Sequence, residues 1–243
     1  MTPMNRRLFA CLAPAALMLV GGAQAVSAAS QPATWDDLVL TKSTSSRVVY
    51  LLPGADFRPY TKVMLDPPEI AFRKDWQRDY NRTVRSPSER ITDRDVHQAV
   101  EDGGKAFSEI LAKAFAEGGY AVVTTPGPDV LRLRSAVIDL TVSAPDRMTP
   151  GRSQTFAGET GSGKLVLEAR DSMTGAVLGR AVDARVAGTD RMKLTTSIQT
   201  RSDFRILAQN WAKATVKGLN SLKTASPSGP GRRIPADVGR RKC

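Results

Sequence analysis

Residues 164–186, KLVLEARDSMTGAVLGRAVDARV, carry the clearest structural pattern in the chain. On the first arm every second residue is apolar, namely Leu165, Leu167 and Ala169. Turn-forming residues follow at 171–175, and the alternation resumes at 177–186. Alternation with a period of two, interrupted by a short turn, predicts an antiparallel β-hairpin. We expect ion pairs on its outer face, made by the four charged residues Glu168, Arg170, Asp183 and Arg185.

Shorter apolar runs on the N-terminal side of this hairpin predict further strands. They lie at residues 48–52, at 62–65 with a continuation at 69–72, at 120–125 and at 130–142. Pro67 and Pro68 cannot donate hydrogen bonds to a ladder, so the strand that they interrupt is expected to be bent or at an edge. Along 130–142 the apolar residues change parity, which predicts a shift of phase, such as a bulge, near Ser135 and Ala136.

Two longer segments have the residue spacing of amphipathic helices. The first begins with Thr92 or Asp93 as its N-cap and ends at residues 118–119, a pair of glycines. Two further glycines, at 103–104, weaken this helix by about 1 kcal/mol each relative to alanine, and leave open whether its first half is a separate turn. The second helix is expected at 197–223. Its apolar side comprises Phe204, Leu207, Ala208, Trp211, Leu219 and Leu222.

The predicted strands and helices do not alternate strictly along the chain, which favours an α+β fold over a doubly wound parallel sheet. We expect a mostly antiparallel mixed sheet with two amphipathic helices packed on one face. The expected organisation is a signal peptide at 1–29, a lead-in segment at 30–46, a single α+β domain at 47–223 and a disordered basic tail at 224–243.

The N-terminal segment has the three parts of a cleavable secretory signal. Arg6 and Arg7 precede an apolar run at residues 8–20, and small residues follow it. The run is shorter than the roughly 20 residues that a membrane-spanning helix needs, so we expect an exported, periplasmic protein without a membrane anchor. The sequence leaves open cleavage near residue 25, 28 or 29, and export by the general or the twin-arginine route.

The formal net charge of +11 is concentrated at the two ends of the chain. Residues 223–243 hold six cations against Asp237, and the signal segment adds Arg6 and Arg7. The modest charge of the domain between these ends argues against a nucleic-acid-binding face, so we expect no nucleic acid as a partner. For the tail we expect at most a weak contact with an anionic surface, and a solubilising role is the simpler interpretation.

Residues 158–164, GETGSGK, have the glycine and lysine positions of a phosphate-binding P-loop. The next residue, Leu165, lacks the hydroxyl that this motif needs for a magnesium ion. The motif also has to lead into a helix, whereas here an alternating strand follows. We therefore interpret the segment as a flexible glycine-rich loop and expect no cofactor.

The remaining candidates for chemistry are few. His97 is the only histidine, and Cys243 is the only cysteine left after cleavage of the signal, which excludes the common zinc sites and an intramolecular disulfide. No Gly-x-Ser-x-Gly elbow accompanies His97, so we expect it on a helix surface. Asp66 and Glu69 flank two prolines and form a carboxylate pair suited to acid–base work or a hard cation, but no cluster of further oxygen ligands accompanies them. We assign no catalytic, cofactor-binding or metal-binding residue.

Six stretches of the chain share a pattern with one known family. They are residues 49–57, 60–67, 71–76, 127–134 and 168–175 and the helix around Trp211. These stretches resemble the bacterial envelope family catalogued as domain of unknown function 3313 (DUF3313), over about residues 47–222, and 60–76 is the most specific part. Members of that family are often lipoproteins, whereas this sequence has no well-placed lipoprotein cleavage box. The resemblance implies an envelope location and supplies no reaction and no catalytic residue.

Two functions from different classes follow as expectations. The first is a non-enzymatic interaction or accessory protein of the periplasm, with an envelope protein as its partner. The alternative is a carboxylate-dependent hydrolase or carbohydrate-binding envelope protein that uses Asp66 and Glu69.

Overall fold

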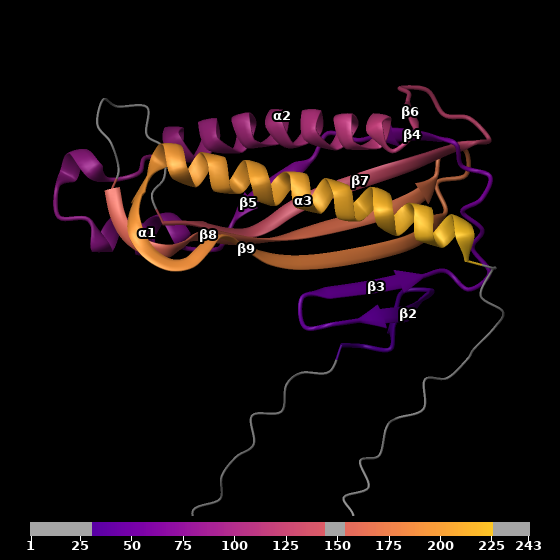
Figure 1. Cartoon of the computed structure of the whole chain (residues 1–243), viewed down its shortest axis with the longest axis horizontal. Coiled ribbons are helices and arrows are strands. Elements are labelled where there is room, and N and C mark those ends of the chain that lie inside the picture. The colour runs from indigo at the N-terminus through magenta and orange to yellow at the C-terminus, as the bar shows by residue number, and fades with distance from the viewer. Residues whose placement is uncertain (1–30, 144–153, 226–243) are drawn as a thin grey trace, which may run out of the picture. The chain divides into compact units, whose positions relative to one another are not determined.

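The structure, a computed structural model, describes residues 31–143 and 154–225, with nine strands and two long helices among them (Figure 1). The strands are β1 (Thr34–Trp35), β2 (Leu38–Ser43), β3 (Arg47–Leu51), β4 (Lys62–Leu65), β5 (Glu69–Phe72), β6 (Ala121–Val122), β7 (Val130–Val142), β8 (Gln154–Asp171) and β9 (Val177–Thr196). They form one mixed sheet in the order β1-β2-β3-β9-β8-β7-β4-β6, and β5 also pairs with β7. The expected signal peptide at 1–29, and residues 226–243 of the expected tail, lie outside the described residues.

The helices cover one face of this sheet. They are α2 (Asp93–Glu117) and α3 (Ser197–Thr224), preceded in the chain by the shorter α1 (Trp76–Thr83) and the 3-10 turn η1 (Pro87–Glu89). α2 packs over β4, β5 and β6, while α3 packs over β8 and β9, and the two helices lie side by side (Figure 1). β4 and β5 pair in parallel with their neighbours, and the other pairs are antiparallel. The expected α+β class, with a mostly antiparallel mixed sheet and two helices on one face, is confirmed.

The start of α2 follows from its sequence. Thr92 is the N-cap, and its hydroxyl accepts a hydrogen bond from the backbone N–H of Asp95. The Asp95 carboxylate accepts in return from the Thr92 backbone N–H at 2.8 Å, which completes a capping box. The helix then continues without a break through Gly103 and Gly104 to its C-cap at Gly118, so its first half is not a separate turn.

The core lies between the helices and the sheet. Its fully or nearly buried apolar residues include Phe107, Leu111 and Phe115 from α2, Leu207, Trp211 and Leu219 from α3, and Leu131, Leu133, Val137 and Leu165 from the strands. All six apolar residues predicted for the inner side of α3 belong to this core or pack against it. Burying each of these larger side chains stabilises the fold by about 1.5–3 kcal/mol, which makes this layer the main source of stability. None of the helices in the described part of the chain is long and apolar enough to span a membrane.

The predicted hairpin is present as β8 and β9, but its ion pairs do not share one face. Glu168 pairs across the strands with Arg180, while Asp183 lies opposite Leu165, which is buried against the helices. Asp183 is itself 6% exposed and pairs with Arg47 and Arg185. The expectation of a single ladder on the outer face was therefore wrong, because residues 168 and 183 face opposite sides of the sheet.

The predicted shift of phase in β7 exists but lies further along the strand. The inward parity of Leu133 continues through Ser135 to Val137, and the register shifts between Ile138 and Thr141. Asp139 carries the irregularity, with a positive φ of 53°. Ser135 is a small polar residue at an inward position, so it interrupted the apolar pattern without changing the direction of the side chains.

Two expected segments differ in their structure. The lead-in segment at 30–46 contributes β1 and β2, which extend the sheet beyond β3. Leu38 of this segment is buried with Val48 and Tyr50 in a second, smaller cluster. Conversely, the strand expected at 120–125 comprises only the two residues of β6.

Candidate functional site

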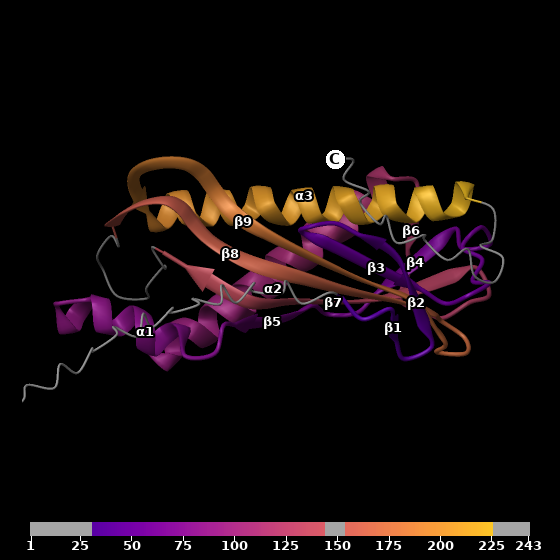
Figure 2. The same ribbon diagram turned by 90° about the horizontal axis from the view of Figure 1, so that it is seen from below.

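A row of arginines lies on the sheet face that points away from the helices. Leu131 and Leu133 of β7 point into the core, so Arg132 and Arg134, which alternate with them, point to the opposite face. On the neighbouring strand β8, Arg170 is the direct cross-strand partner of Arg132. Figure 2 shows the molecule from below, with β7 and β8 in front of α2.

Two carboxylates reach these arginines from the break between β4 and β5. The backbone N–H of Asp66 donates to the carbonyl of Leu133 at 3.0 Å, which fixes Asp66 beside β7. Its carboxylate accepts from Arg132 Nε at 2.9 Å and 3.0 Å. Arg134 lies between the two acids, with Nε 3.7 Å from Asp66 and Nη2 3.5 Å from Glu69. The two candidate carboxylates of the sequence are thus brought together, each facing a guanidinium group.

These side chains line a groove of about 360 Å³, which we call the arginine groove. Its lining consists of Asp66, Pro67, Glu69, Arg132, Arg134, Arg170 and Gly175. Three cations and two acids line it, so the groove carries an excess of positive charge.

The turn between β8 and β9 closes one side of the arginine groove. Gly175 adopts a φ of 73°, which favours glycine, and its carbonyl accepts from Arg170 Nη1 at 3.1 Å. Asp171 fixes the turn by accepting from the backbone N–H of Thr174 at 2.7 Å and from the hydroxyl of Tyr60 at 2.8 Å. The bond from the Thr174 backbone and that from Tyr60 lower the pKa of Asp171. The groove wall is therefore held by charge-assisted hydrogen bonds to a carboxylate that stays ionised at neutral pH.

Glu168 connects the arginine groove to the next strand. It accepts from Arg170 Nε at 2.6 Å and from Arg180 Nε at 2.7 Å. Burial, which raises the pKa of Glu168, is outweighed by these two hydrogen bonds, and the pKa is lowered. Arg180 also pairs with Asp36 and lies 4.8 Å from the centre of the Trp35 ring. The arginines are thereby held in fixed positions.

The electrostatics of the groove favour an anion. Like charges directly opposite each other on neighbouring strands are destabilising, and Arg132 and Arg170 are such a pair. Among the described residues, the two terminal nitrogens of Arg132 and Nη2 of Arg170 have no hydrogen-bond partner. These donors are available to a carboxylate or phosphate, which a guanidinium group binds in a planar, two-pronged manner.

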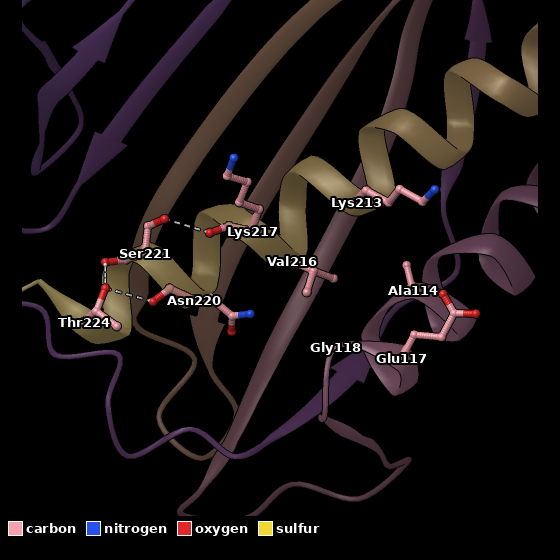
Figure 3. A pocket seen from close by; sticks show the side chains of 9 residues that line it. All are labelled: Ala114, Glu117, Gly118, Lys213, Val216, Lys217, Asn220, Ser221 and Thr224. Carbon is pink, nitrogen blue, oxygen red and sulfur yellow. Dashed lines mark hydrogen bonds between the residues drawn. The ribbon is translucent and has the colours of Figure 1, made fainter.

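A second hollow lies between the C-terminal ends of α2 and α3 and measures about 470 Å³ (Figure 3). Several polar side chains at its edge bond within their own helix: Ser221 donates to the carbonyl of Lys217 at 2.9 Å, and Thr224 donates to that of Ser221 at 3.0 Å. Asn220 accepts from the Tyr120 hydroxyl. These polar groups already form hydrogen bonds within the protein. The arginine groove, which has unpaired donors among the described residues, is therefore the stronger candidate for a binding site.

The P-loop-like segment at 158–164 has no phosphate-binding geometry. It lies within β8, not in the flexible loop that we expected, because its residues pair with both β7 and β9. The Nζ of Lys164 lies 2.7 Å from a carboxylate oxygen of Asp139. A strand also presents its backbone N–H groups to its neighbours, so they cannot converge on one phosphate.

His97 lies on the surface of α2, as expected. Its side chain is 77% exposed, and Nδ1 is 3.6 Å from Glu101, one helical turn away. Within residues 31–143 and 154–225, no group of three or more histidine, cysteine, aspartate or glutamate side chains could hold a metal ion. The functional candidates that the sequence did not reveal are Arg132 and Arg134, whose only signal was alternation with core leucines. Arg170 was expected only as a member of an ion pair on the outer face of the hairpin.

The fold and the groove define an α+β protein whose sheet is covered by helices on one face and carries paired charges on the other. The chain belongs to the family described as protein of unknown function (DUF3313), whose model matches residues 35–215. This confirms the resemblance seen in the sequence. The match includes Trp35 of β1 and all of β2, in agreement with their place in the sheet. None of the curated proteins matches the sequence.

Several solved structures are similar to this chain at low sequence identity. A PelC dodecamer variant from Paraburkholderia phytofirmans is 16% identical, with 71% of this chain and 96% of that chain covered, at a TM-score of 0.37. A DUF330 protein from Xanthomonas campestris is 13% identical, covers 70% and 90%, and has a TM-score of 0.34. A minor lipoprotein from Acinetobacter baumannii is 9% identical, covers 67% and 94%, and has a TM-score of 0.29. At these scores nothing about the function of this chain follows from the likeness.

Proposed function

We propose that this protein is exported to the bacterial periplasm and acts there as a non-enzymatic interaction or accessory protein, which binds acidic side chains of an envelope protein in the arginine groove. The observation that carries the proposal is the direct opposition of Arg132 and Arg170 on the sheet face opposite the helices, with guanidinium donors that have no partner among the described residues. Export rests on the sequence of the N-terminal segment.

The arginine side chains of the groove are held in position before a ligand binds, in addition to having the right charge. Hydrogen bonds to Asp66 and Glu168 hold the guanidinium groups in place, so little side-chain entropy is lost when a ligand binds. Charge-assisted hydrogen bonds contribute about 1.5–3 kcal/mol each when formed, so two or three of them support specific recognition of a carboxylate.

The geometry gives less support to a hydrolase that uses Asp66 and Glu69. General acid catalysis needs a carboxyl group that keeps its proton near neutral pH, usually because burial disfavours its charge. Here the Glu69 side chain is 75% exposed, and both acids already face arginines, at 2.9 Å for Asp66 and at 3.5 Å for Glu69. We therefore expect the double variant D66N/E69Q to retain any binding of envelope glycans that the wild-type protein has.

In-cell photo-crosslinking tests the proposed interaction. A photoreactive residue at Met173, which is 63% exposed in the turn beside the groove, should capture one defined envelope protein. The same residue at Ala116, exposed on α2, serves as the matched control and should not capture that protein. The variant R132Q/R170Q should reduce the capture at least tenfold, since it removes the proposed acid-binding donors.

This variant is designed to keep the fold intact. Asp66 retains Arg134 as a partner and Glu168 retains Arg180, so no carboxylate is left without a cation. The loss of stability should be about 1–3 kcal/mol, because Glu168 and Asp66 are part-buried and each loses a charge-assisted hydrogen bond, and thermal unfolding checks that the variant is folded. Equal capture by the wild-type protein and a folded R132Q/R170Q variant, or no capture from Met173 with intact protein, would refute the proposed site.

Export is tested separately by cell fractionation and N-terminal sequencing. The mature protein should be found in the periplasmic fraction, with an N-terminus near residue 25, 28 or 29. An uncleaved Met1 on protein in the cytosol would refute export without affecting the geometry of the groove.

A further inference from the structure

The outward side of α3 differs in charge from that of the neighbouring helix. The exposed side of α2 carries both acids and cations. The exposed acids include Asp93, Glu101, Asp102, Glu109 and Glu117. On α3 the single acid is Asp203, which is 8% exposed and accepts from Gln199 at 2.9 Å. The exposed charges of α3 are therefore all positive.

Three of these cations lie on the outward side of the helix. At 3.6 residues per turn, Arg205, Lys213 and Lys217 fall within an arc of about 120° around α3. All three are exposed and form no salt bridge within the part of the chain that the structure describes. Figure 3 shows the side chains of Lys213 and Lys217 extending away from the helix.

Two isoleucines accompany the cations. Ile198 and Ile206 are 61% and 52% exposed, which makes them two of the most exposed large apolar side chains described. By the same helical geometry they fall within the arc that the cations span. The isoleucines and the cations together extend from residue 198 to residue 217, or roughly 28 Å at 1.5 Å per residue. We call them together the α3 outer face.

We propose that the α3 outer face rests on the surface of an anionic lipid bilayer. Helices that lie in the plane of a membrane combine lysine and arginine with exposed apolar side chains in this way: the cations contact lipid phosphates and the apolar groups enter the boundary with the acyl chains. A soluble polyanion would explain the cations but would leave the isoleucines exposed. The straight, 28 Å arrangement matches a flat surface.

The chain beyond α3 carries charge of the same sign. α3 ends at Thr224, and the sequence that follows contains Arg232, Arg233, Arg240, Arg241 and Lys242. These cations therefore follow α3 in the sequence, within 20 residues of its end. Additional cations near an anionic surface add to its attraction, so the tail should strengthen the contact made by the helix.

Vesicle sedimentation of the mature chain tests this inference. The protein should sediment with vesicles of phosphatidylcholine containing phosphatidylglycerol, remain in solution with phosphatidylcholine alone, and be released as salt is raised. The variant R205Q/K213Q/K217Q should bind about 100-fold more weakly. The variant I198S/I206S should bind about tenfold more weakly. The control R94Q/K105Q, which removes two exposed cations of α2, should bind like the wild type.

The results distinguish a lipid surface bound by α3 from binding by the tail alone and from binding of a soluble polyanion. A protein truncated after residue 225 should keep measurable binding, and this binding should still depend on the α3 outer face. Binding that disappears with the tail and is unaffected by the α3 variants would refute the inference. It would equally be refuted if I198S/I206S bound like the wild type while a soluble polyanion such as heparin competed fully. All these residues are exposed, so the variants should fold, which circular dichroism checks.

Discussion

Replacing Gly118 by alanine should destabilise the protein, because a methyl group has no room there. Gly118 is the C-cap of α2 at the point where α2 and α3 approach each other. A Cβ at this position would lie 2.5 Å from Cγ1 of Val216 and 3.2 Å from the carbonyl oxygen of Ala114. Val216 is 8% exposed and β-branched, so it cannot rotate away easily, and the helices would have to separate.

The size of the effect follows from the cost of overpacking, which is about 1–3 kcal/mol. For a domain of this length, each kcal/mol changes Tm by about 2–4 °C, so G118A should lower Tm by about 2–12 °C. Gly218 provides the matched control, since it lies inside α3 with no atom within 4 Å of an added Cβ. The same substitution there should stabilise the helix by about 1 kcal/mol. Thermal and urea unfolding of the two variants should therefore give changes of opposite sign.

A double-mutant cycle decides whether the contact with Val216 is the cause. Val216→Ala removes Cγ1, so G118A/V216A should be less destabilised than the sum of the two single variants. If G118A is as stable as the wild type, or if the two changes are additive, the close approach of α2 and α3 is not what excludes a side chain at residue 118.

Two further predictions concern charge and capping. The pKa of Glu168 is lowered in the folded state, so the stability that it contributes is complete above its unfolded pKa of about 4.5 and is lost as pH falls through the lower folded value. The difference in Tm between the wild type and E168Q should therefore shrink as pH falls from about 6 to about 3. A difference that grows over this range would contradict the prediction. Thr92→Ala should cost about 1 kcal/mol by removing the capping box of α2, whereas Thr92→Ser should be close to neutral; equal losses in both variants would show that the hydroxyl is not responsible.

Where a residue has one strong local reason for its conformation, the sequence predicted the structure well. Thr92, one of the two N-cap residues that the sequence offered, begins α2, and the alternation around residues 171–175 predicted the hairpin. The two glycines at 103–104 did not break α2. The packing of Phe107 and Leu111 in the core outweighs a cost of about 1 kcal/mol for each glycine.

The errors arose where long-range pairing decides the outcome. Residues 158–164 are rich in glycine and suggest a loop, yet hydrogen bonds from β7 and β9 on both sides hold them in β8. Gly161 is needed in this strand because a Cβ there would lie only 2.6 Å from the ring of Phe204. Likewise, Ser135 concealed the true position of the bulge at Asp139, since the pattern of one strand does not show which residues face its partners.

The arginine groove could be predicted only in part. Asp66 and Glu69 were identified because they are close in sequence, but their partners Arg132 and Arg134 are more than 60 residues away and meet them through the parallel pairing of β4 and β5 with β7. That pairing changes the chemistry from an acid pair to an ion-paired groove with an excess of cations.

The two proposed surfaces are compatible because they belong to opposite layers of the fold. Side chains alternate across β7 and β8, so the arginines that line the groove point away from the face on which α3 packs. The outward side of α3 in turn points away from the sheet. A protein that rests on a membrane through α3 would therefore keep the arginine groove open to a partner. If both surfaces are used, R132Q/R170Q should reduce capture of the partner at least tenfold without reducing sedimentation with anionic vesicles. R205Q/K213Q/K217Q should weaken sedimentation with the vesicles and leave capture of the partner in solution unchanged. Loss of both activities in either variant would mean that the two faces do not act independently.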